Sequence, residues 1–200
     1  MDKAYIVEQL KLLVEKFDLD ISEEAISEAV GFSEFKVYSK GQMPGRIGDD
    51  ASVSGIVMSG VIRSFYVDSD GNDITQYFAT EGSLCIDEGM MGFGERVAMW
   101  EALEESTLML FKVSDMKKLI LGDERLKSVW IDLLEGSLRY KIYRENGFLV
   151  ENATERYLAF RKRFPELISR IPQRYIATYL GIKPESLSRI RSALKEEKEQ

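Results

Sequence analysis

The residues best suited to do chemistry lie near the C-terminal end of the chain, in residues 173–190. Small and apolar residues fall there at the places where two helices must cross at a tight turn. The apolar faces come from Ile176, Leu180, Leu187 and Ile190. Ala177 lets the helices approach, Gly181 can adopt the positive φ that ends the first helix, and Pro184 suits the first turn of the second. The pattern predicts a helix-turn-helix.

The second of these helices would expose hydroxyl, carboxylate and guanidinium groups, which read base edges or hold phosphates in protein–DNA complexes. The groups belong to Glu185, Ser186, Ser188, Arg189 and Arg191. A helical hairpin inside a bundle would show apolar residues at similar intervals, but its surface has no need of such groups. The segment therefore favours DNA binding.

Charge supports this interpretation once it is divided along the chain. The protein carries 27 basic and 34 acidic residues, for a net charge of −7, and this average argues against a nucleic-acid partner. Residues 1–150, however, hold 16 basic and 27 acidic residues, whereas residues 151–200 hold 11 and 7. The predicted helix-turn-helix thus lies in the cationic part of an acidic chain.

The composition excludes several classes of function. Without histidine, the usual zinc and haem ligand sets and His-dependent nucleophilic catalysis are missing. The single cysteine, Cys85, cannot form an internal disulfide. No segment approaches the ~20 apolar residues of a membrane helix, and the N-terminus lacks the apolar core of a signal peptide. We expect a cytoplasmic protein that is not an enzyme and holds no metal or cofactor.

Two short helices and a β-rich region precede the helix-turn-helix. Residues 3–17 place apolar side chains on one helical face, and residues 22–30 predict a second helix introduced by Ser22. Between residues 32 and 113, short β-rich runs alternate with turn signals about ten residues apart, as in an all-β barrel or roll. Turn residues 70–72 between two of these runs predict a β-hairpin.

From about Asp123 the apolar period becomes helical, and successive apolar or small residues follow at intervals of three and four. This seam contains Leu126, Val129, Leu133, Gly136, Tyr140, Tyr143, Gly147 and Val150. Its length favours a coiled-coil homodimer, although the same pattern also suits a helix buried within its own domain. A second stripe, which could rest on the β-region, contains Trp130, Leu134, Leu138 and Ile142.

In this order of elements the chain resembles the Crp/Fnr family of bacterial transcription factors, in its Bacteroidetes-type branch, over essentially its whole length. The resemblance is most specific in residues 171–191 and in residues 101–106, ahead of the last β-run. It implies an α+β fold with an N-terminal β-roll, jelly-roll-like and similar to cyclic-nucleotide-binding domains, and with short flanking helices. A long dimerisation helix and a C-terminal all-α helix-turn-helix domain follow. A full wing is missing, because residues 195–200 form only a short charged tail.

The resemblance also implies three domains and a set of partners. The β-roll sensor would occupy residues 1–122, the dimerisation helix residues 123–151 and the DNA-binding domain residues 152–200. A homodimer would bind a two-fold symmetric double-stranded DNA operator, with RNA polymerase and a small-molecule effector as further partners and no membrane. The alternative is a dimeric signalling or scaffold protein with a cyclic-nucleotide-binding-like domain that binds no DNA.

Family positions that touch base edges in the major groove match Glu185 and Arg189. A glutamate can accept from cytosine, and an arginine can donate two hydrogen bonds to guanine. Neighbouring contacts to bases or phosphates would come from Ser186 and Ser188. Side chains expected to hold the phosphate backbone are Gln173, Arg174, Lys183 and Arg191.

Cyclic-nucleotide binders of the family grip ribose and phosphate with a glutamate and a later arginine, which Glu88 and Arg96 match here. Asp87 would repel a phosphate and Val97 replaces a hydroxyl, so we expect either an effector other than a cyclic nucleotide or a constitutive dimer with no ligand. Iron–sulfur and haem sensors need ligands that the chain lacks. An apolar ligand pocket, or simply the β-roll core, would use Met90, Met91, Phe93, Met99 and Trp100.

Overall fold

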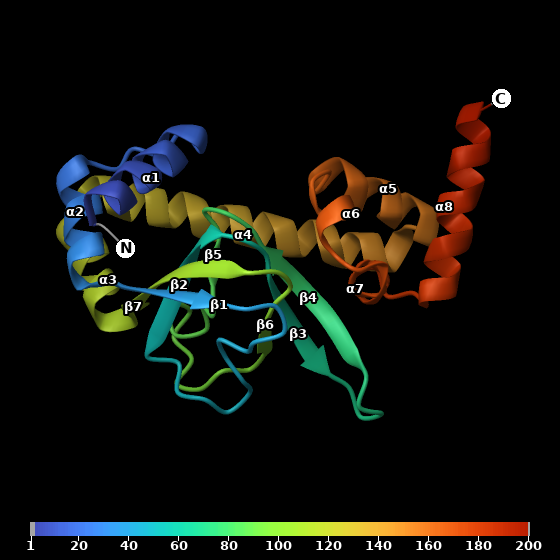
Figure 1. The fold of residues 1–200 in the computed structure, drawn as a ribbon, viewed down its shortest axis with the longest axis horizontal. Helices are drawn as coiled ribbons and strands as arrows, with labels where there is room; N and C mark the ends of the chain where they lie inside the picture. The colour runs from blue at the N-terminus through green and yellow to red at the C-terminus, as the bar shows by residue number, and fades with distance from the viewer. Residues whose placement is uncertain (1–2, 200) are drawn as a thin grey trace. The chain divides into compact units, whose positions relative to one another are not determined.

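The computed structural model describes the backbone of residues 3–199 and the side chains of residues 4–196 (Figure 1). Its residues form two compact units. We call residues 1–66 and 77–135 the N-terminal unit, and residues 67–76 and 136–200 the C-terminal unit. None of the helices in the described part of the chain is long and apolar enough to cross a membrane.

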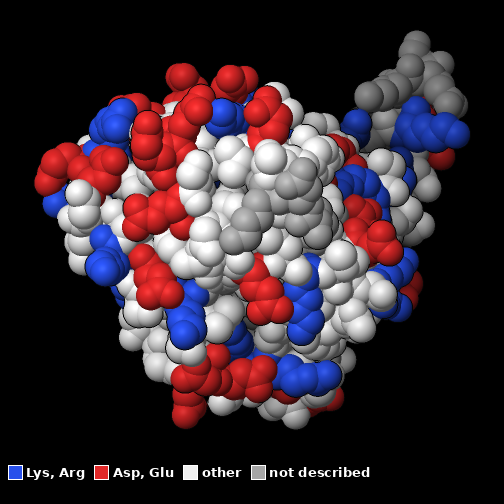
Figure 2. Space-filling model, turned by 60° about the vertical axis from the view of Figure 1, so that its left-hand side comes forward, with Lys and Arg blue, Asp and Glu red and all other residues white. Residues whose placement is uncertain are grey.

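Two helices open the N-terminal unit, as the sequence predicts. They are α1 (Lys3–Lys16) and α2 (Glu23–Phe32). Ser22 caps α2, because its side chain accepts a hydrogen bond of 3.2 Å from the backbone N–H of Ala25. Figure 2 brings this end of the molecule forward, and acidic side chains are spread over it among basic ones.

Within the described residues, seven strands form two antiparallel sheets, which together make the predicted β-roll. The four-stranded sheet has the order β1-β7-β2-β5 and the three-stranded sheet the order β4-β3-β6. The strands are β1 (Glu34–Tyr38), β2 (Val53–Ser59), β3 (Ile62–Val67), β4 (Asp73–Ala79), β5 (Leu84–Cys85), β6 (Met99–Ala102) and β7 (Ser106–Lys112). The predicted hairpin is β3–β4, whose turn contains Gly71 at φ +82°. The short strands β5 and β6 were not predicted.

Strand β7 is buried on both faces. Leu108 lies in a core cluster with Val57, Ile62 and Trp100. The next residue, Met109, lies in a second cluster to which α1 and α2 contribute. Because successive side chains of a strand point to opposite faces, this continuous apolar strand serves two cores at once.

Two helices follow the roll, α3 (Val113–Gly122) and α4 (Glu124–Val150). Helix α3 was not predicted, because the helical period that the sequence shows starts only at Asp123. Asp123 separates the two helices, and its side chain accepts a hydrogen bond of 2.8 Å from the backbone N–H of Arg125. This contact satisfies a free amide at the start of α4.

The first turns of α4 contain two residues of the predicted dimer seam that are buried within the N-terminal unit. Leu126 and Val129 are each only 8% exposed in the single chain, so they belong to the core of their own unit. Trp130 packs against the cluster under the N-terminal helices, as predicted. Conversely, Leu138 and Ile142, which were expected to rest on the roll, are 60% and 57% exposed.

The remaining seam positions divide between surface and interior. Leu133, Tyr143 and Val150 are exposed, as is Gly136. Gly147 is buried, and Tyr140 is half-buried. The predicted stripe is therefore not one continuous surface, and only part of it is open to a partner.

Four helices complete the chain: α5 (Ala153–Arg163), α6 (Leu167–Arg170), α7 (Gln173–Tyr179) and α8 (Pro184–Glu199). Asn152 and Glu155 form a capping box at the start of α5. The core of these helices includes Tyr157, Phe160 and Leu167. Residues 195–199 continue α8 and are not the separate tail expected, while Gln200 lies outside the described residues. No wing strand follows the helix-turn-helix within the described range.

Candidate nucleic-acid interface

Helices α7 and α8 meet at a tight turn that depends on Gly181. Its φ of +67° lies in the left-handed region, as predicted for this glycine. The N–H of Gly181 donates to the carbonyl of Thr178 at 3.2 Å, and the N–H of Ile182 donates to the carbonyl of Ala177 at 3.0 Å. This pair of bonds is a Schellman motif, which satisfies carbonyls at the end of α7 and reverses the chain.

Helix α8 begins at Pro184, also as predicted. The carbonyl of Lys183 accepts hydrogen bonds from the N–H groups of Ser186 at 3.0 Å and Leu187 at 3.2 Å, which starts the helical ladder. Glu185 places an acid in the first turn, where its negative charge is stabilised by the positive end of the helix dipole. The start of α8 is therefore stabilised by the backbone conformation of Pro184 and by the charge of Glu185.

The two helices pack through the small and apolar residues that the sequence singled out. Ile176, Ala177, Leu180 and Leu187 are each at most 2% exposed. Ile190 is half-buried one turn after Leu187. Because these positions occupy one face of each helix, the polar positions between them are left for the opposite face.

The structure places most of the predicted DNA contacts at the surface. Exposed side chains are Gln173, Arg174, Lys183, Glu185, Ser188 and Arg189, and half-buried ones are Ser186 and Arg191. Glu185 and Arg189 are one helical turn apart on α8, and the side chain of neither forms a hydrogen bond or ion pair with another described residue. Arg174 differs, because its Nη2 donates to the hydroxyl of Tyr175 at 2.7 Å. The α8 surface therefore presents a free carboxylate and a free guanidinium together.

Other residues, which the sequence analysis missed, hold the end of α7. The Nη2 of Arg144 donates to the carbonyl of Tyr179 at 2.9 Å and to the carbonyl of Thr75 at 3.1 Å. The Nε of Arg156 donates to the carbonyl of Leu180 at 3.1 Å. Cations are favourable at a helix C-terminus because they neutralise its negative dipole end. Nothing in the helical periodicity marks these arginines, so no sequence signal pointed to them.

Two further hydrogen bonds fix α7 within the C-terminal unit. The hydroxyls of Thr75 and Thr178 lie 2.6 Å apart, which joins the tip of the β3–β4 hairpin to α7. The hydroxyls of Tyr140 and Tyr179 lie 2.8 Å apart, which joins α4 to α7. The first helix of the helix-turn-helix is thus tied to two segments that precede it in the sequence.

The two candidate effector residues of the N-terminal unit bond each other. Glu88 and Arg96 are each 5% exposed. The Nη1 of Arg96 lies 3.3 Å from Oε2 of Glu88 and donates at 3.0 Å to the carbonyl of Ile86. Its Nη2 donates to the carbonyl of Val53 at 2.8 Å. Three hydrogen bonds within the chain therefore use this guanidinium.

The carboxylate of Glu88 is equally engaged. Its Oε1 accepts from the indole N–H of Trp100 at 3.0 Å and from the backbone N–H of Ala98 at 3.3 Å. With the ion pair to Arg96, both carboxylate oxygens have partners. The pair fits a buried structural contact, since both carboxylate oxygens and both terminal nitrogens of the guanidinium have partners within the chain.

The apolar residues considered for an effector pocket are dispersed. Met90 belongs to the cluster under the N-terminal helices, whereas Trp100 belongs to the other core cluster. Met91 and Phe93 are 43% and 51% exposed. They do not gather around one cavity.

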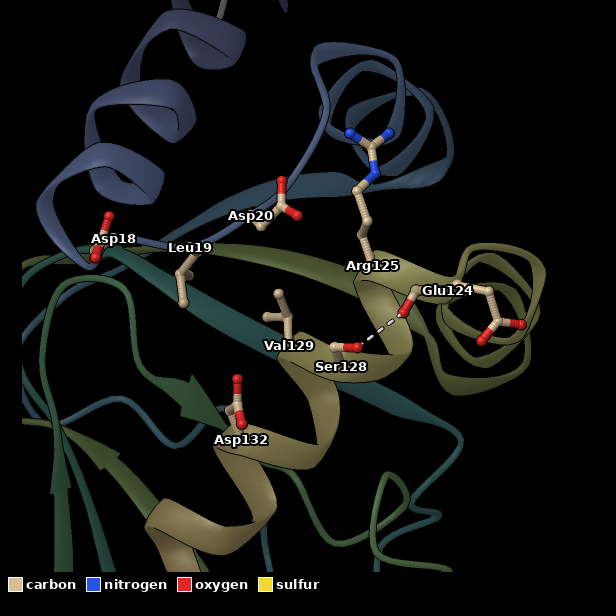
Figure 3. Close-up of a pocket in the computed structure, with 8 residues that line it drawn as sticks. All are labelled: Asp18, Leu19, Asp20, Glu124, Arg125, Ser128, Val129 and Asp132. Carbon is tan, nitrogen blue, oxygen red and sulfur yellow. Dashed lines mark hydrogen bonds between the residues drawn. The ribbon is translucent and has the colours of Figure 1, made fainter.

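A cavity of about 320 Å³ does lie in the N-terminal unit, and Figure 3 shows its lining. Asp18, Asp20 and Asp132 surround Leu19 and Val129, so the lining is acidic. Such a lining repels a phosphate or carboxylate ligand. Among the described residues, no group of three or more acidic or cysteine side chains is arranged to hold a metal ion.

Comparisons with known proteins agree with this architecture. FixK2 from Bradyrhizobium japonicum is 22% identical, with a TM-score of 0.74 over 82% of this chain and 85% of that chain. The catabolite activator protein of Thermus thermophilus is 23% identical, with a TM-score of 0.57 over 89% of this chain and 85% of that chain. A CRP/FNR-family transcriptional regulator, also from Thermus thermophilus, is 18% identical, with a TM-score of 0.65 over 82% of this chain and 87% of that chain.

No family model matches the chain, and no curated protein sequence matches it. Each alignment to these solved structures nevertheless covers more than four fifths of both chains. The chain therefore has the α+β fold of the Crp/Fnr transcription regulators.

Proposed function

We propose that the protein is a sequence-specific DNA-binding transcription regulator that acts as a homodimer. The observation that carries the proposal is the surface of α8, where Glu185 and Arg189 lie one turn apart with no partner among the described residues. A helix that packs on α7 through Leu187 and leaves such groups free is suited to enter the major groove. The cationic composition of residues 151–200 adds the attraction that phosphates require.

In this proposal the side chains have two kinds of role. Arg189 donates to a guanine and Glu185 accepts from a cytosine, which gives sequence preference. The side chains that hold phosphates and fix the register are Gln173, Arg174, Lys183 and Arg191, while Ser186 and Ser188 contact neighbouring phosphates or bases.

The proposed dimer uses an exposed stripe of α4, and none of its residues belongs to the predicted seam. Leu138, Ile142 and Leu149 are 60%, 57% and 76% exposed. Their spacings of four and seven residues keep them on one side of the helix, as a coiled-coil seam requires. Two copies joined along this stripe would hold two α8 helices about 34 Å apart, one turn of DNA.

We also propose the division of the chain into a sensor domain at residues 1–122, a dimerisation helix at 123–151 and a DNA-binding domain at 152–200. A small-molecule effector and RNA polymerase are the proposed further partners. The ligand of the sensor is not a cyclic nucleotide in this proposal, because Glu88 and Arg96 are already bonded to each other.

Selection of binding sites from a random duplex library tests the proposal, with Arg189→Ala and Arg191→Ala as a matched pair. The wild-type dimer should select a two-fold symmetric site, with an affinity that falls steeply as salt rises. Arg189→Ala should lose preference at one base pair of each half-site, worth about 1–3 kcal/mol. Arg191→Ala should weaken binding to all sequences alike and keep the preference. Absence of any selected site would favour the alternative of a scaffold protein that binds no DNA. An unchanged sequence preference in Arg189→Ala would show that Arg189 does not read a base.

A further inference from the structure

A cleft of about 530 Å³ lies entirely within the C-terminal unit. Its lining comes from the second half of α4, from α5 and from the end of α7. A volume of this size suits a small organic ligand, for which pockets of about 300–1,000 Å³ are usual. The cleft is separate from the α8 surface to which DNA binding is assigned.

The lining is strongly cationic. It contains Arg144, Arg156, Lys162 and Arg163, against the single acid Glu151. None of the four cations forms an ion pair with an acidic residue in the described part of the chain. The cleft therefore carries a positive charge that the protein itself leaves uncompensated.

Two of the cations have acceptors within the chain and two do not. Arg144 and Arg156 donate to carbonyls at the end of α7. The exposed side chains of Lys162 and Arg163 donate no hydrogen bond to any described residue, so they can reach a ligand. Moreover, Nη1 of Arg144 is buried without an acceptor among the described residues. Buried donors normally have partners, so this nitrogen is left without the acceptor that would balance it.

The same cleft is lined by aromatic rings. Tyr140, Phe148, Phe160 and Tyr179 all contribute, and the rings of Phe160 and Tyr179 have centroids 5.1 Å apart. The guanidinium of Arg163 lies 4.5 Å from the centroid of the Tyr140 ring. A guanidinium that stacks on a ring through its face keeps its edge donors free for a carboxylate, sulfonate or phosphate.

We propose that this cleft binds a small planar anion, an aromatic ring system that bears one acidic group. The acidic group would meet Arg163 and Lys162, and the ring would pack against the aromatic wall. Planar rings gain from both the aromatic faces and the stacked cations, which a simple inorganic anion does not.

A second copy of the chain is a poorer occupant. If the two-fold axis of a dimer passed through the cleft, the clefts of the two copies would face each other, so four cations without acidic partners would meet four more. Like charges in such contact oppose association. The exposed stripe of α4 with Leu138 and Ile142 is apolar and has no such penalty.

Occupancy of the cleft would act on the helix-turn-helix directly. Arg144 and Arg156 line the cleft and also hold the carbonyls of Tyr179 and Leu180, immediately before Gly181. An anion that attracts either guanidinium competes with those carbonyls. The inferred site is thus an effector site that differs from the β-roll site of the proposed sensor.

Calorimetric titration of the native protein without DNA tests the inference, so that its outcome is independent of the proposed DNA binding. The probes are 2-naphthalenesulfonate, the neutral 2-naphthalenemethanol and inorganic phosphate. We expect the sulfonate to bind with a Kd of about 1 mM or tighter, and both other probes to bind at least about tenfold more weakly. Arg163→Gln should weaken sulfonate binding about tenfold or more. Arg161→Gln, on the same helix but outside the lining, should leave it unchanged.

Three results would overturn the inference. They are equal affinity for the sulfonate and the neutral alcohol, the same loss of sulfonate affinity in Arg163→Gln and Arg161→Gln, and no sulfonate binding in the millimolar range. If Arg163→Gln proves misfolded in its thermal melt, Lys162→Gln replaces it with the same expectation. Sedimentation with the sulfonate should give an unchanged mass. Dissociation of the dimer by the sulfonate would assign the cleft to a second copy instead and would also overturn the inference.

Discussion

The buried pair of Glu88 and Arg96 makes the sharpest prediction about the β-roll. Substitution of Glu88 by Gln keeps the shape and the acceptor for the Trp100 indole, but removes the charge opposite a guanidinium that is 5% exposed. Breaking a buried ion pair from one side costs about 3–5 kcal/mol. Arg96 retains two carbonyl acceptors, at 3.0 and 2.8 Å, so we expect the lower end, about 3 kcal/mol.

Urea unfolding at a fixed protein concentration measures this loss, and Trp100 lies beside the pair as a fluorescent reporter. Glu95→Gln is the control, because Glu95 is exposed on the same segment and its loss should cost less than about 0.5 kcal/mol. Adding Arg96→Met to Glu88→Gln should recover part of the stability, since no unpaired charge then remains buried. A cost below about 1 kcal/mol for Glu88→Gln would refute the structural role and return both residues to the candidates for ligand binding.

Four further predictions follow from single residues. Burial raises the pKa of the Cys85 thiol well above its usual range, so this thiol should react with a disulfide reagent only in the unfolded protein; rapid reaction of the folded protein would contradict its burial. Gly181→Ala should destabilise the C-terminal unit by about 1–2 kcal/mol in urea unfolding because of its positive φ, and an unchanged stability would show that the turn can adopt another form. Gly136→Ala, with open space around the added methyl group, should instead stabilise α4 by up to about 1 kcal/mol; a weakened dimer would place Gly136 in the interface. Hydrogen bonds from the backbone and side chain of Asn72 hold the pKa of the Asp68 carboxyl below its usual range. The stability that this carboxylate gives the hairpin turn should therefore be complete above the pKa of the unfolded state and be lost as the pH falls through the pKa of the folded state. An NMR titration that finds a usual or raised pKa for Asp68 would contradict this prediction.

The helix-turn-helix was predictable because its local geometry needs particular residues. A left-handed turn needs Gly181, the first turn of α8 accepts Pro184, and close packing needs Ala177 and Leu187. Each requirement is visible in the sequence without knowledge of any distant contact. The hairpin turn at Gly71 was predictable for the same reason.

The faces of α4 were not predictable in the same way. A helical period identifies stripes, but both stripes of α4 have the same period, and only the tertiary structure decides which side chains become buried. Leu126 and Val129 are buried, whereas Leu138 and Ile142 are exposed. The pairing of Glu88 with Arg96 shows the same limit, because a spacing that suits a ligand also suits a contact within the chain.

The bond between Thr75 and Thr178 joins residues 103 positions apart in the sequence. During synthesis the hairpin leaves the ribosome long before α7, so the last helices assemble on a segment that is already present. A fragment that begins at residue 136 would lack both the hydroxyl and the carbonyl that Thr75 supplies. The helix-turn-helix of this protein is therefore not a self-contained module, and a chimera that transfers it without residues 67–76 lacks part of the structure that holds it in place.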